Sequence, residues 1–233
     1  MDERKRFWNL EYSRDEFIYG RAPSYLAEFV VSRFKGTGRR LLEIGCGYGR
    51  DLIFYALNGF AAEGVDISDV AISQGRRWTE SLGVKVRFYE GDFLEVEFEE
   101  DSFDIIVSYH TLYLLSKEER EEAVQKIFSM LKPGGITAHL VFSKEEDTYG
   151  KGREVEKDSF EWAEGKIVHY FEREELQRLF GSFRIIELSR VDIKEFHDSR
   201  EHIHKDWLII ASKEERRCKT WHLNNPVNQK EKG

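Results

Sequence analysis

Cysteine is scarce in this chain of 233 residues, which has only Cys46 and Cys218. One lies in a glycine-rich turn and the other near the end, so the sequence supports neither a disulfide framework nor a thiolate zinc site. No run approaches the roughly 20 apolar residues of a membrane span. The first residues, Met1 to Arg6, lack the apolar stretch of a signal peptide. We therefore expect a cytoplasmic protein that does not cross a membrane.

Positive charge is also in short supply, because 36 Lys and Arg face 44 Asp and Glu for a formal net charge of −8. This balance argues against a protein that coats nucleic acid, although a local basic patch stays possible, and it favours a small-molecule partner. The 40% of hydrophobic residues can form one substantial core. We expect a single domain over residues 1–213 and a polar, disordered tail over residues 214–233. The sequence leaves the oligomeric state open.

An apolar strand, Leu41 to Gly45, opens directly into alternating glycines and then a stretch compatible with a helix. Glycine allows positive φ and a close approach of a ligand to the backbone. The N–H groups at the start of the following helix present partial positive charge to a carboxylate or phosphate. Two acidic residues follow later strands, Asp66 and Asp92. Together these features indicate an adenosyl ligand.

The chain resembles the class I S-adenosylmethionine-dependent methyltransferases over roughly residues 38 to 142. Their first motif, an acidic residue followed by G-x-G-x-G, matches Glu43, Gly45, Gly47 and Gly49. A dinucleotide-binding G-x-G-x-x-G would need a glycine at the position of Arg50. The segment Leu131 to Gly135 looks like the family's turn before its fifth strand. The resemblance implies S-adenosylmethionine as the cofactor and S-adenosylhomocysteine as the product.

The hydrophobic pattern predicts an α/β fold in which strands alternate with helices. The expected strands are 41–45, 61–66, 84–89, 103–109, 136–142, 183–188 and 207–211, and the expected helices are 25–34, 51–57, one capped by Ser68 or Asp69, one opened by the capping box Ser116–Glu119, and 172–180. We predict a Rossmann-like, doubly wound, mostly parallel seven-stranded sheet with helices on both faces and an antiparallel C-terminal strand. The charged stretch from Lys144 to Lys166, within residues 143–170, is predicted to be a long substrate-side loop.

In such sheets a ligand lies beyond the carboxyl ends of the strands, where the strand order reverses. Asp66 would accept hydrogen bonds from the ribose hydroxyls, because an ionised carboxylate suits a vicinal diol. The resemblance implies that Asp92 accepts from the adenine amino group. The alternative is that both acids only form turns and caps. The expected cofactor-binding residues are Glu43, Gly45, Cys46, Gly47, Tyr48, Gly49, Arg50, Asp66, Ile67, Ser68, Gly91, Asp92, Phe93, Tyr109 and Tyr19.

The residues after the fourth strand are those that the family usually places beside the sulfonium and the acceptor. His110 is the candidate general base, needed only if the acceptor holds a proton. Tyr109 or Tyr113 would orient the acceptor or offer a ring face to the sulfonium cation. Arg21 would meet an anionic or electron-rich acceptor. The alternatives are that His110 only packs in the pocket wall and that Arg21 is solvated. The pair His202 and His204 lacks a third ligand at zinc spacing, so we expect no metal.

The aromatic N-terminal segment, residues 1–37, is similar to the start of tellurite-resistance-type and thiopurine-type methyltransferases, which folds over the cofactor. Packing of its aromatic residues on the sheet edge is the alternative. The sequence thus predicts an enzyme that moves a methyl group from S-adenosylmethionine to a small-molecule acceptor by in-line displacement. An RNA or protein methyltransferase, and a non-catalytic sensor or partner subunit that binds S-adenosylmethionine, remain as alternatives.

Overall fold

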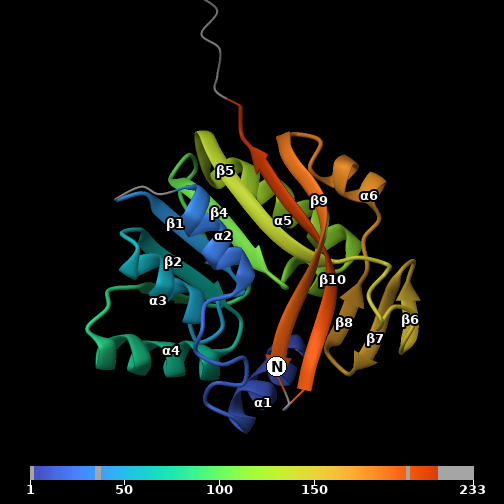
Figure 1. The fold of residues 1–233 in the computed structure, drawn as a ribbon, viewed down its shortest axis with the longest axis horizontal. Coiled ribbons are helices and arrows are strands. Elements are labelled where there is room, and N and C mark those ends of the chain that lie inside the picture. Colours follow the sequence, from blue (N-terminus) through green and yellow to red (C-terminus); the bar gives the residue numbers. More distant parts are fainter. Residues whose placement is uncertain (1–2, 35–37, 198–199, 215–233) are drawn as a thin grey trace, which may run out of the picture.

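A seven-stranded sheet forms the centre of the computed structural model, which describes residues 3–34, 38–197 and 200–214 (Figure 1). The strand order is β3-β2-β1-β4-β5-β10-β9. These strands are β1 (Arg40–Ile44), β2 (Ala61–Asp66), β3 (Arg87–Glu90), β4 (Phe103–Tyr109), β5 (Leu131–Phe142), β9 (Arg184–His197) and β10 (Arg200–Ser212). β1 to β5 pair in parallel, and β10 is antiparallel to both β5 and β9. The predicted fold class is confirmed.

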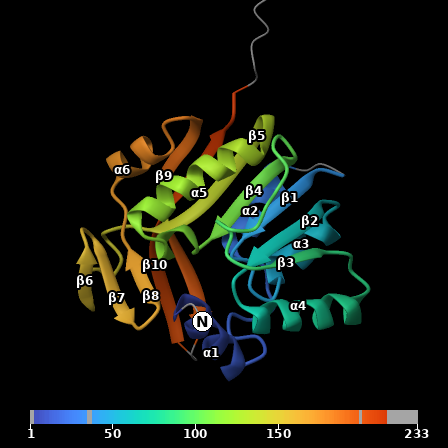
Figure 2. The same cartoon turned by 180° about the vertical axis from the view of Figure 1, so that it is seen from behind.

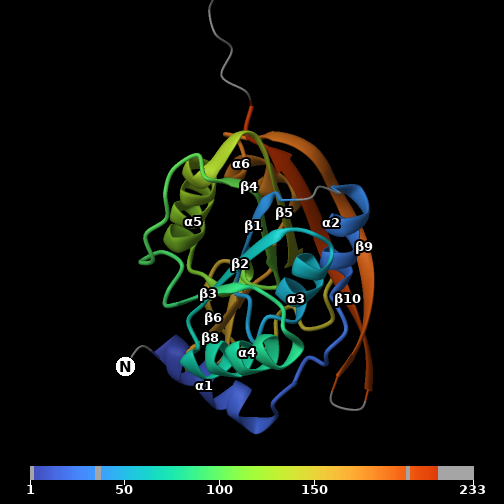
Figure 3. The same cartoon turned by 90° about the vertical axis from the view of Figure 1, so that its left-hand side faces the viewer.

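Helices cover both faces of this sheet, as the sequence predicts (Figures 2 and 3). The helices are α2 (Tyr25–Arg33), α3 (Arg50–Leu57) and α4 (Asp69–Leu82) on one face, and α5 (Lys117–Met130) and α6 (Arg173–Leu179) on the other. Adjacent strand residues point to opposite faces. Leu41 accordingly packs in the core beneath α2 and α3, whereas Leu42 packs in the core beneath α5. The near-continuous apolar strands of the sequence follow from this double burial.

Two helix caps predicted from the sequence are formed in the structure. Ser116 and Glu119 form the expected capping box at the start of α5. Ser68 caps α4 by accepting a hydrogen bond from the N–H of Ala71 at 3.1 Å. In the described part of the chain, no helix is long and apolar enough to cross a membrane.

The prediction of a long loop over residues 143–170 is wrong, because this stretch folds into a second, three-stranded antiparallel sheet. Its strands are β6 (Arg153–Glu156), β7 (Ser159–Ala163) and β8 (Lys166–His169). The three strands are only four or five residues long, so each gives a weak periodic signal in the sequence. Phe160 and Val168 supply the buried side, and charged residues such as Glu161 lie on the rim.

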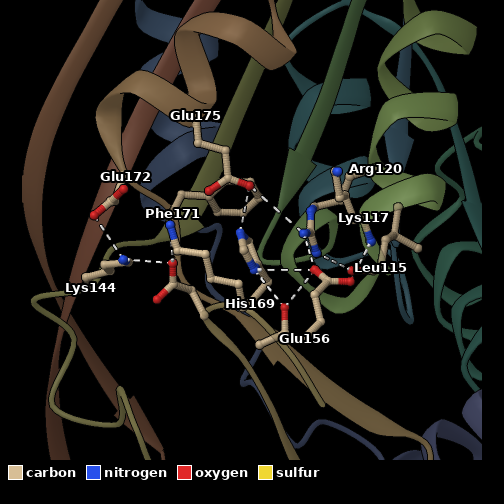
Figure 4. A network of polar contacts seen from close by, with 12 residues as sticks. Leu115, Lys117, Arg120, Lys144, Glu156, His169, Phe171, Glu172 and Glu175 are labelled. Carbon is tan, nitrogen blue, oxygen red and sulfur yellow. Dashed lines mark hydrogen bonds and ion pairs between the residues drawn. The ribbon is translucent and has the colours of Figure 1, made fainter. Parts of the chain in front are cut away.

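Ion pairs and hydrogen bonds join this small sheet to α5 and α6 (Figure 4). The buried ring of His169 contacts Ser159 Oγ at 2.7 Å through Nδ1 and Glu175 Oε1 at 2.9 Å through Nε2. Arg120 of α5, whose side chain is 3% exposed, pairs with Glu156 and donates to the Leu115 carbonyl. The small sheet is therefore fixed to the main body and does not hang from it as a loop.

The bounds of four strands differ clearly from the prediction. The third strand begins at Arg87 and not at Val84, and the fifth begins at Leu131, before the glycine pair, with a register shift against β4. The last two strands are much longer than residues 183–188 and 207–211, since β9 and β10 pair along a hairpin. Their added length comes from polar residues that alternate poorly. From residue 215 on, the predicted tail lies outside the described residues.

An N-terminal helix, α1 (Glu3–Arg14), precedes α2 and lies within residues 1–37, the segment predicted to be helical and aromatic without bounds for this helix. It lies beside α4 at the carboxyl edge of the sheet (Figures 1 and 3). The Gln74 side chain of α4 donates to the Tyr12 carbonyl at 2.8 Å, and Ser68 Oγ donates to Asn9 at 2.7 Å. The aromatic rings of Tyr12 and Tyr48 meet edge to face at 6.0 Å. The N-terminal segment is thus bound to the elements that follow the first two strands.

Candidate active site

The glycine turn lies between β1 and α3, at the point where the strand order reverses. Gly45 has a φ of 73°, which disfavours any residue with a Cβ. A Cβ at Gly45 would also lie 2.1 Å from Thr111 Oγ1, so the loop after β4 closes directly on the turn. Glycine is therefore needed at position 45 for two reasons: the positive φ of the turn and the close packing of the loop that contains Thr111.

Asp66 ends β2 beside this turn. Its carboxylate accepts hydrogen bonds from the Gly47 N–H and the Ser68 N–H, each at 2.8 Å. Burial raises the pKa of Asp66 to about 6, although both backbone hydrogen bonds oppose this shift. The residue is 8% exposed and lines the two cavities described next. Asp66 holds the glycine turn in shape and leaves an edge of its carboxylate towards the cavities.

Two adjoining cavities lie at this edge of the sheet. The first, of about 150 Å³, is lined by Trp8, Tyr12, Tyr19, Glu43, Gly45, Cys46, Gly47, Tyr48, Arg50, Asp51, Asp66, Tyr109, His110, Thr111, Tyr113 and Leu114. The second, of about 60 Å³, is lined by Arg4, Trp8, Ile44, Gly45, Val65, Asp66, Ile67, Gly91, Asp92, Phe93, Leu94, Thr111, Leu114 and Leu115. Trp8 of α1 belongs to both cavities, so the N-terminal helix covers the place where they meet.

Most of the predicted site residues line one of these cavities, but three do not. Gly49 is the N-cap of α3, and Ser68 is buried as the cap of α4. Arg21 is exposed, with its guanidinium 4.0 Å from the centre of the Phe17 ring. It borders a neighbouring hollow that also contains Tyr19 and Arg50. The structure thus brings Arg21 near the first cavity without making it part of the lining.

Glu43 carries the clearest sign of a missing ligand group. It is 3% exposed, and in the described chain its Oε2 atom has no hydrogen-bond partner. Burial, with the charge of Asp51 nearby, raises the pKa of Glu43. A buried carboxylate oxygen without a donor is costly to the fold. Since Glu43 lines the first cavity, a ligand with a donor group would satisfy that oxygen.

Asp92 lies at the second cavity. Its Oδ1 accepts from the Leu94 N–H at 2.9 Å, and its Oδ2 is 3.8 Å from Arg4 of α1. Phe93 is 7% exposed beside it. The sequence analysis did not select Arg4, because an arginine in a highly charged N-terminal stretch has no local signal that distinguishes it.

The far wall of the first cavity is built from the end of β4. His110 has a φ of 54°, an uncommon conformation for a residue with a side chain. Its ring stacks on Tyr109 at 4.2 Å and lies 5.6 Å from the ring of Tyr113. Its Nε2 atom is 2.7 Å from Oδ2 of Asp206 in β10. The predicted candidates His110 and Tyr113 are therefore neighbours in one wall.

Acidic and basic residues of the long hairpin support that wall. Tyr109 donates to Glu195 of β9, and Arg50 lies 3.8 Å from the same carboxylate. His204 Nδ1 is 3.3 Å from Glu146. Burial opposes a charge on His204, but Glu146, Glu195 and Asp206 together raise its pKa. The sequence analysis missed Asp206, Glu195 and Glu146; the alternation of His204 and Asp206 along one strand face was the available signal.

No cluster of three or more histidine, cysteine or acidic side chains able to hold a metal ion occurs within residues 3–34, 38–197 and 200–214. His202 and His204 have rings 6.3 Å apart. His204 contacts Glu146 of the loop after β5.

Comparison with known proteins identifies the domain. Residues 41–135 match the family model of a methyltransferase domain. The carboxy-S-adenosyl-L-methionine synthase of Wolinella succinogenes is 29% identical over 136 residues, which is 57% of this chain and 55% of that protein. The chain spans about half the length of the curated relatives that it matches.

Two solved structures share the fold. An S-adenosylmethionine-dependent methyltransferase from Methanosarcina mazei has a TM-score of 0.69 at 23% identity, with 80% of this chain and 97% of that chain covered. The 1,6-didemethyltoxoflavin-N1-methyltransferase of Burkholderia thailandensis, solved with 1,6-didemethyltoxoflavin and S-adenosylhomocysteine, has a TM-score of 0.65 at 20% identity, covering 88% of this chain and 82% of that chain. The resemblance drawn from the glycine motif is confirmed: this chain carries a methyltransferase domain of the class I, S-adenosylmethionine-dependent type.

The residues present fit the cofactor of that class. The turn from Gly45 to Gly49 leaves room for a ligand against the backbone, and Glu43, which has an unpartnered buried oxygen, lines the same space. Asp66 lies between the two cavities, where a ribose diol would meet its carboxylate.

Proposed function

We propose that this protein transfers the methyl group of S-adenosylmethionine to a small-molecule acceptor by in-line displacement and releases S-adenosylhomocysteine. One observation carries the proposal. The glycine turn that fits the cofactor and the wall that contains His110 and Tyr113 line a single cavity, which α1 covers with Trp8 and Tyr12. An acceptor that reaches this space must be small enough to lie beneath the helix.

The cofactor would lie across both cavities. The turn from Gly45 to Gly49, with the N-terminus of α3 behind it, suits the methionine carboxylate. Asp66 would hold the ribose between the cavities, and Asp92 and Phe93 of the second cavity would meet the adenine. When bound, the cofactor supplies an already activated methyl group, so the chain's own task is to align the acceptor and exclude water.

The acceptor would lie against Tyr19, Tyr109, His110 and Tyr113. Burial raises the pKa of Tyr109 and of Tyr113, and nearby carboxylates raise both further. Both phenols therefore keep their protons at neutral pH and orient an acceptor as hydrogen-bond donors or ring surfaces. Arg21, in the neighbouring hollow, would attract an anionic acceptor towards the entrance without touching the reacting atoms.

The names of the relatives support an acceptor of low molecular mass. They include sterol 24-C-methyltransferases, such as that of Pneumocystis carinii. One is named a synthase of a carboxylated S-adenosylmethionine. An RNA or protein methyltransferase would need a surface groove at the site, and the covering helix α1 gives no support to that alternative.

Calorimetric titration of the purified protein with S-adenosylmethionine, S-adenosylhomocysteine and NAD tests the ligand class. We expect micromolar binding of both sulfur ligands and none of NAD. Asp66→Asn, whose amide keeps an acceptor for one of the two backbone N–H groups, should weaken binding at least tenfold, whereas Asp69→Asn, an exposed residue at the start of α4, should not.

Release of S-adenosylhomocysteine during incubation with a panel of small acceptors then tests catalysis. Turnover with a small molecule supports the proposal. Turnover only with RNA or protein would replace it by the alternative transferase, and tight binding without turnover on any acceptor would favour the non-catalytic sensor.

A further inference from the structure

We propose that His110 is the general base of the methyl transfer, that Asp206 positions its ring for this task, and that the acceptor atom is an oxygen or nitrogen that carries a proton. The inference rests on the proposed function and deepens it by naming the chemical class of the acceptor. Three observations carry it: the geometry of the pair, the burial of Asp206, and the free nitrogen of the ring.

The pair is formed across the sheet. His110 directly follows β4, and Asp206 lies on β10, opposite Phe142 of β5. The ring of Phe142 is 4.8 Å from that of His110, so the imidazole passes over the end of β5 to reach Asp206. The positive φ of His110 gives its side chain this direction. A strained conformation of this kind persists where the surrounding structure fixes it, and such residues cluster at active sites.

Asp206 is fully buried, with a relative exposure of 0%. Its Oδ2 atom meets His110 Nε2 at 2.7 Å, while its Oδ1 atom has no hydrogen-bond partner in the described chain. A carboxylate placed only for stability would have both oxygens satisfied, because an unpartnered buried acceptor is unfavourable. The arrangement instead resembles a carboxylate that orients a histidine and stabilises its charged form.

The other ring nitrogen of His110 is available. Nδ1 has no hydrogen bond within the described residues, and the ring lines the first cavity together with Tyr113. A neutral imidazole with its hydrogen on Nε2, donated to Asp206, carries a lone pair on Nδ1. That lone pair can accept a proton from an acceptor that lies in the cavity.

The chemical step balances without any further reagent. The acceptor's O–H or N–H group passes its proton to Nδ1 as its oxygen or nitrogen bonds to the methyl carbon. The carbon–sulfur bond breaks, and its electron pair stays on sulfur, which becomes neutral. The imidazolium formed is stabilised by Asp206 and later gives its proton to water. A thiolate or a metalloid anion has no proton to lose and would need no such pair.

Several charged groups face this pair and set its surroundings. Glu195 comes from β9, His204 from β10, Glu146 from the loop after β5, and Arg50 from α3 beyond Tyr109. The ring of His204 lies 5.4 Å from that of His110. Two carboxylates and two basic side chains therefore surround the pair.

The first test uses nuclear magnetic resonance of the full chain labelled with ¹⁵N-histidine, with His110→Gln to assign the signals. We expect neutral His110 to carry its hydrogen on Nε2. In Asp206→Leu the ratio of the Nε2–H to the Nδ1–H tautomer should fall at least tenfold. Asp206→Asn is more certain to fold, and there the ratio should fall less. Asp192→Asn, an exposed change on β9, should leave the tautomer unchanged. A hydrogen on Nδ1 in the unaltered protein, or an unchanged tautomer in Asp206→Leu, would overturn the proposal.

The second test separates chemistry from binding. With catechol as the oxygen probe, histamine as the nitrogen probe and 5-thio-2-nitrobenzoate, a thiol that is ionised at neutral pH, as the sulfur probe, we expect transfer to the first two only. His110→Gln should lower kcat by about 100-fold or more, with little change in the Kd of S-adenosylhomocysteine. Transfer to the thiol alone would refute the acceptor class. If the unaltered protein does not bind the cofactor, the proposed function is refuted. The tautomer measurement would still report the pairing of His110 with Asp206.

Discussion

The phenol oxygen of Tyr12 lies 2.6 Å from the place that a Cβ atom at Gly47 would occupy. Tyr12 belongs to α1 and Gly47 to the turn after β1, so the N-terminal helix packs directly on the backbone of the glycine turn. A glycine at position 47 therefore allows the positive φ of the turn and also leaves room for Tyr12 of α1. Both residues line the first cavity.

Gly47→Ala should displace α1 and weaken the binding of S-adenosylhomocysteine at least tenfold. The new methyl group would meet Tyr12, and a φ of 53° disfavours alanine, so we expect a loss of about 1–3 kcal/mol in the free energy of unfolding. Gly83→Ala is the matched control, since its φ is 66° and nothing lies within 4 Å of its Cβ. It should cost about 1 kcal/mol and leave binding intact. Equal binding by both variants would contradict the contact.

Trp8→Ala should reduce the affinity for S-adenosylhomocysteine about tenfold, because Trp8 lines both cavities and buries apolar area against the ligand. Trp162→Ala removes a tryptophan of β7 that is 39% exposed and lines neither cavity. Its affinity should equal that of the unaltered protein in the same calorimetric titration. If both substitutions change affinity alike, α1 does not cover the ligand.

The free energy of unfolding should depend on pH through Asp66. Its pKa is raised to about 6 in the folded protein, so between about pH 4 and pH 6 the folded state holds a proton that the unfolded chain has released. The contribution of this group to stability therefore falls as the pH rises through that window and is constant above it. Urea unfolding of the unaltered protein and of Asp66→Asn should diverge by about 2–3 kcal/mol between pH 4 and pH 7, in favour of the variant.

Asp69→Asn serves as the control for this pH dependence, since it removes an exposed carboxylate three residues away. Its stability curve should run parallel to that of the unaltered protein. A constant difference between Asp66→Asn and the unaltered protein over the whole window would show that Asp66 has an ordinary pKa.

Arg120→Met should lower the free energy of unfolding by about 3 kcal/mol, because it leaves Glu156 and the buried end of Glu175 without their cation in the network of Figure 4. Arg153→Met breaks another Arg–Glu pair, with Glu161, but that arginine side chain is 75% exposed. We expect a change below about 0.5 kcal/mol there. Chemical unfolding of both variants measures the difference, and similar losses would mean that burial of the pair is unimportant.

Much of the site could be predicted because its signals are local. The positive φ of Gly45, the cap formed by Ser68 and the capping box of Ser116 with Glu119 each depend on residues within a few positions. The rule that ligands lie at the reversal of strand order then placed Asp66 beside the turn. Asp206 escaped prediction because its partner His110 is 96 residues away along the chain. The small sheet escaped prediction because its strands are only four or five residues long.

The sequence by itself determined the class of the domain, the cofactor of that class and the local structure of the loops proposed to hold it, since spacing within a motif directly encodes backbone conformation and short-range contacts. The tertiary structure alone decided which distant residues complete the site. The docking of α1 on Gly47, the course of β10 past the end of β5 and the pairing of His110 with Asp206 all depend on packing between segments that have no common local pattern. Such contacts depend on how the whole core packs, so they cannot be predicted from residues that are neighbours in the sequence.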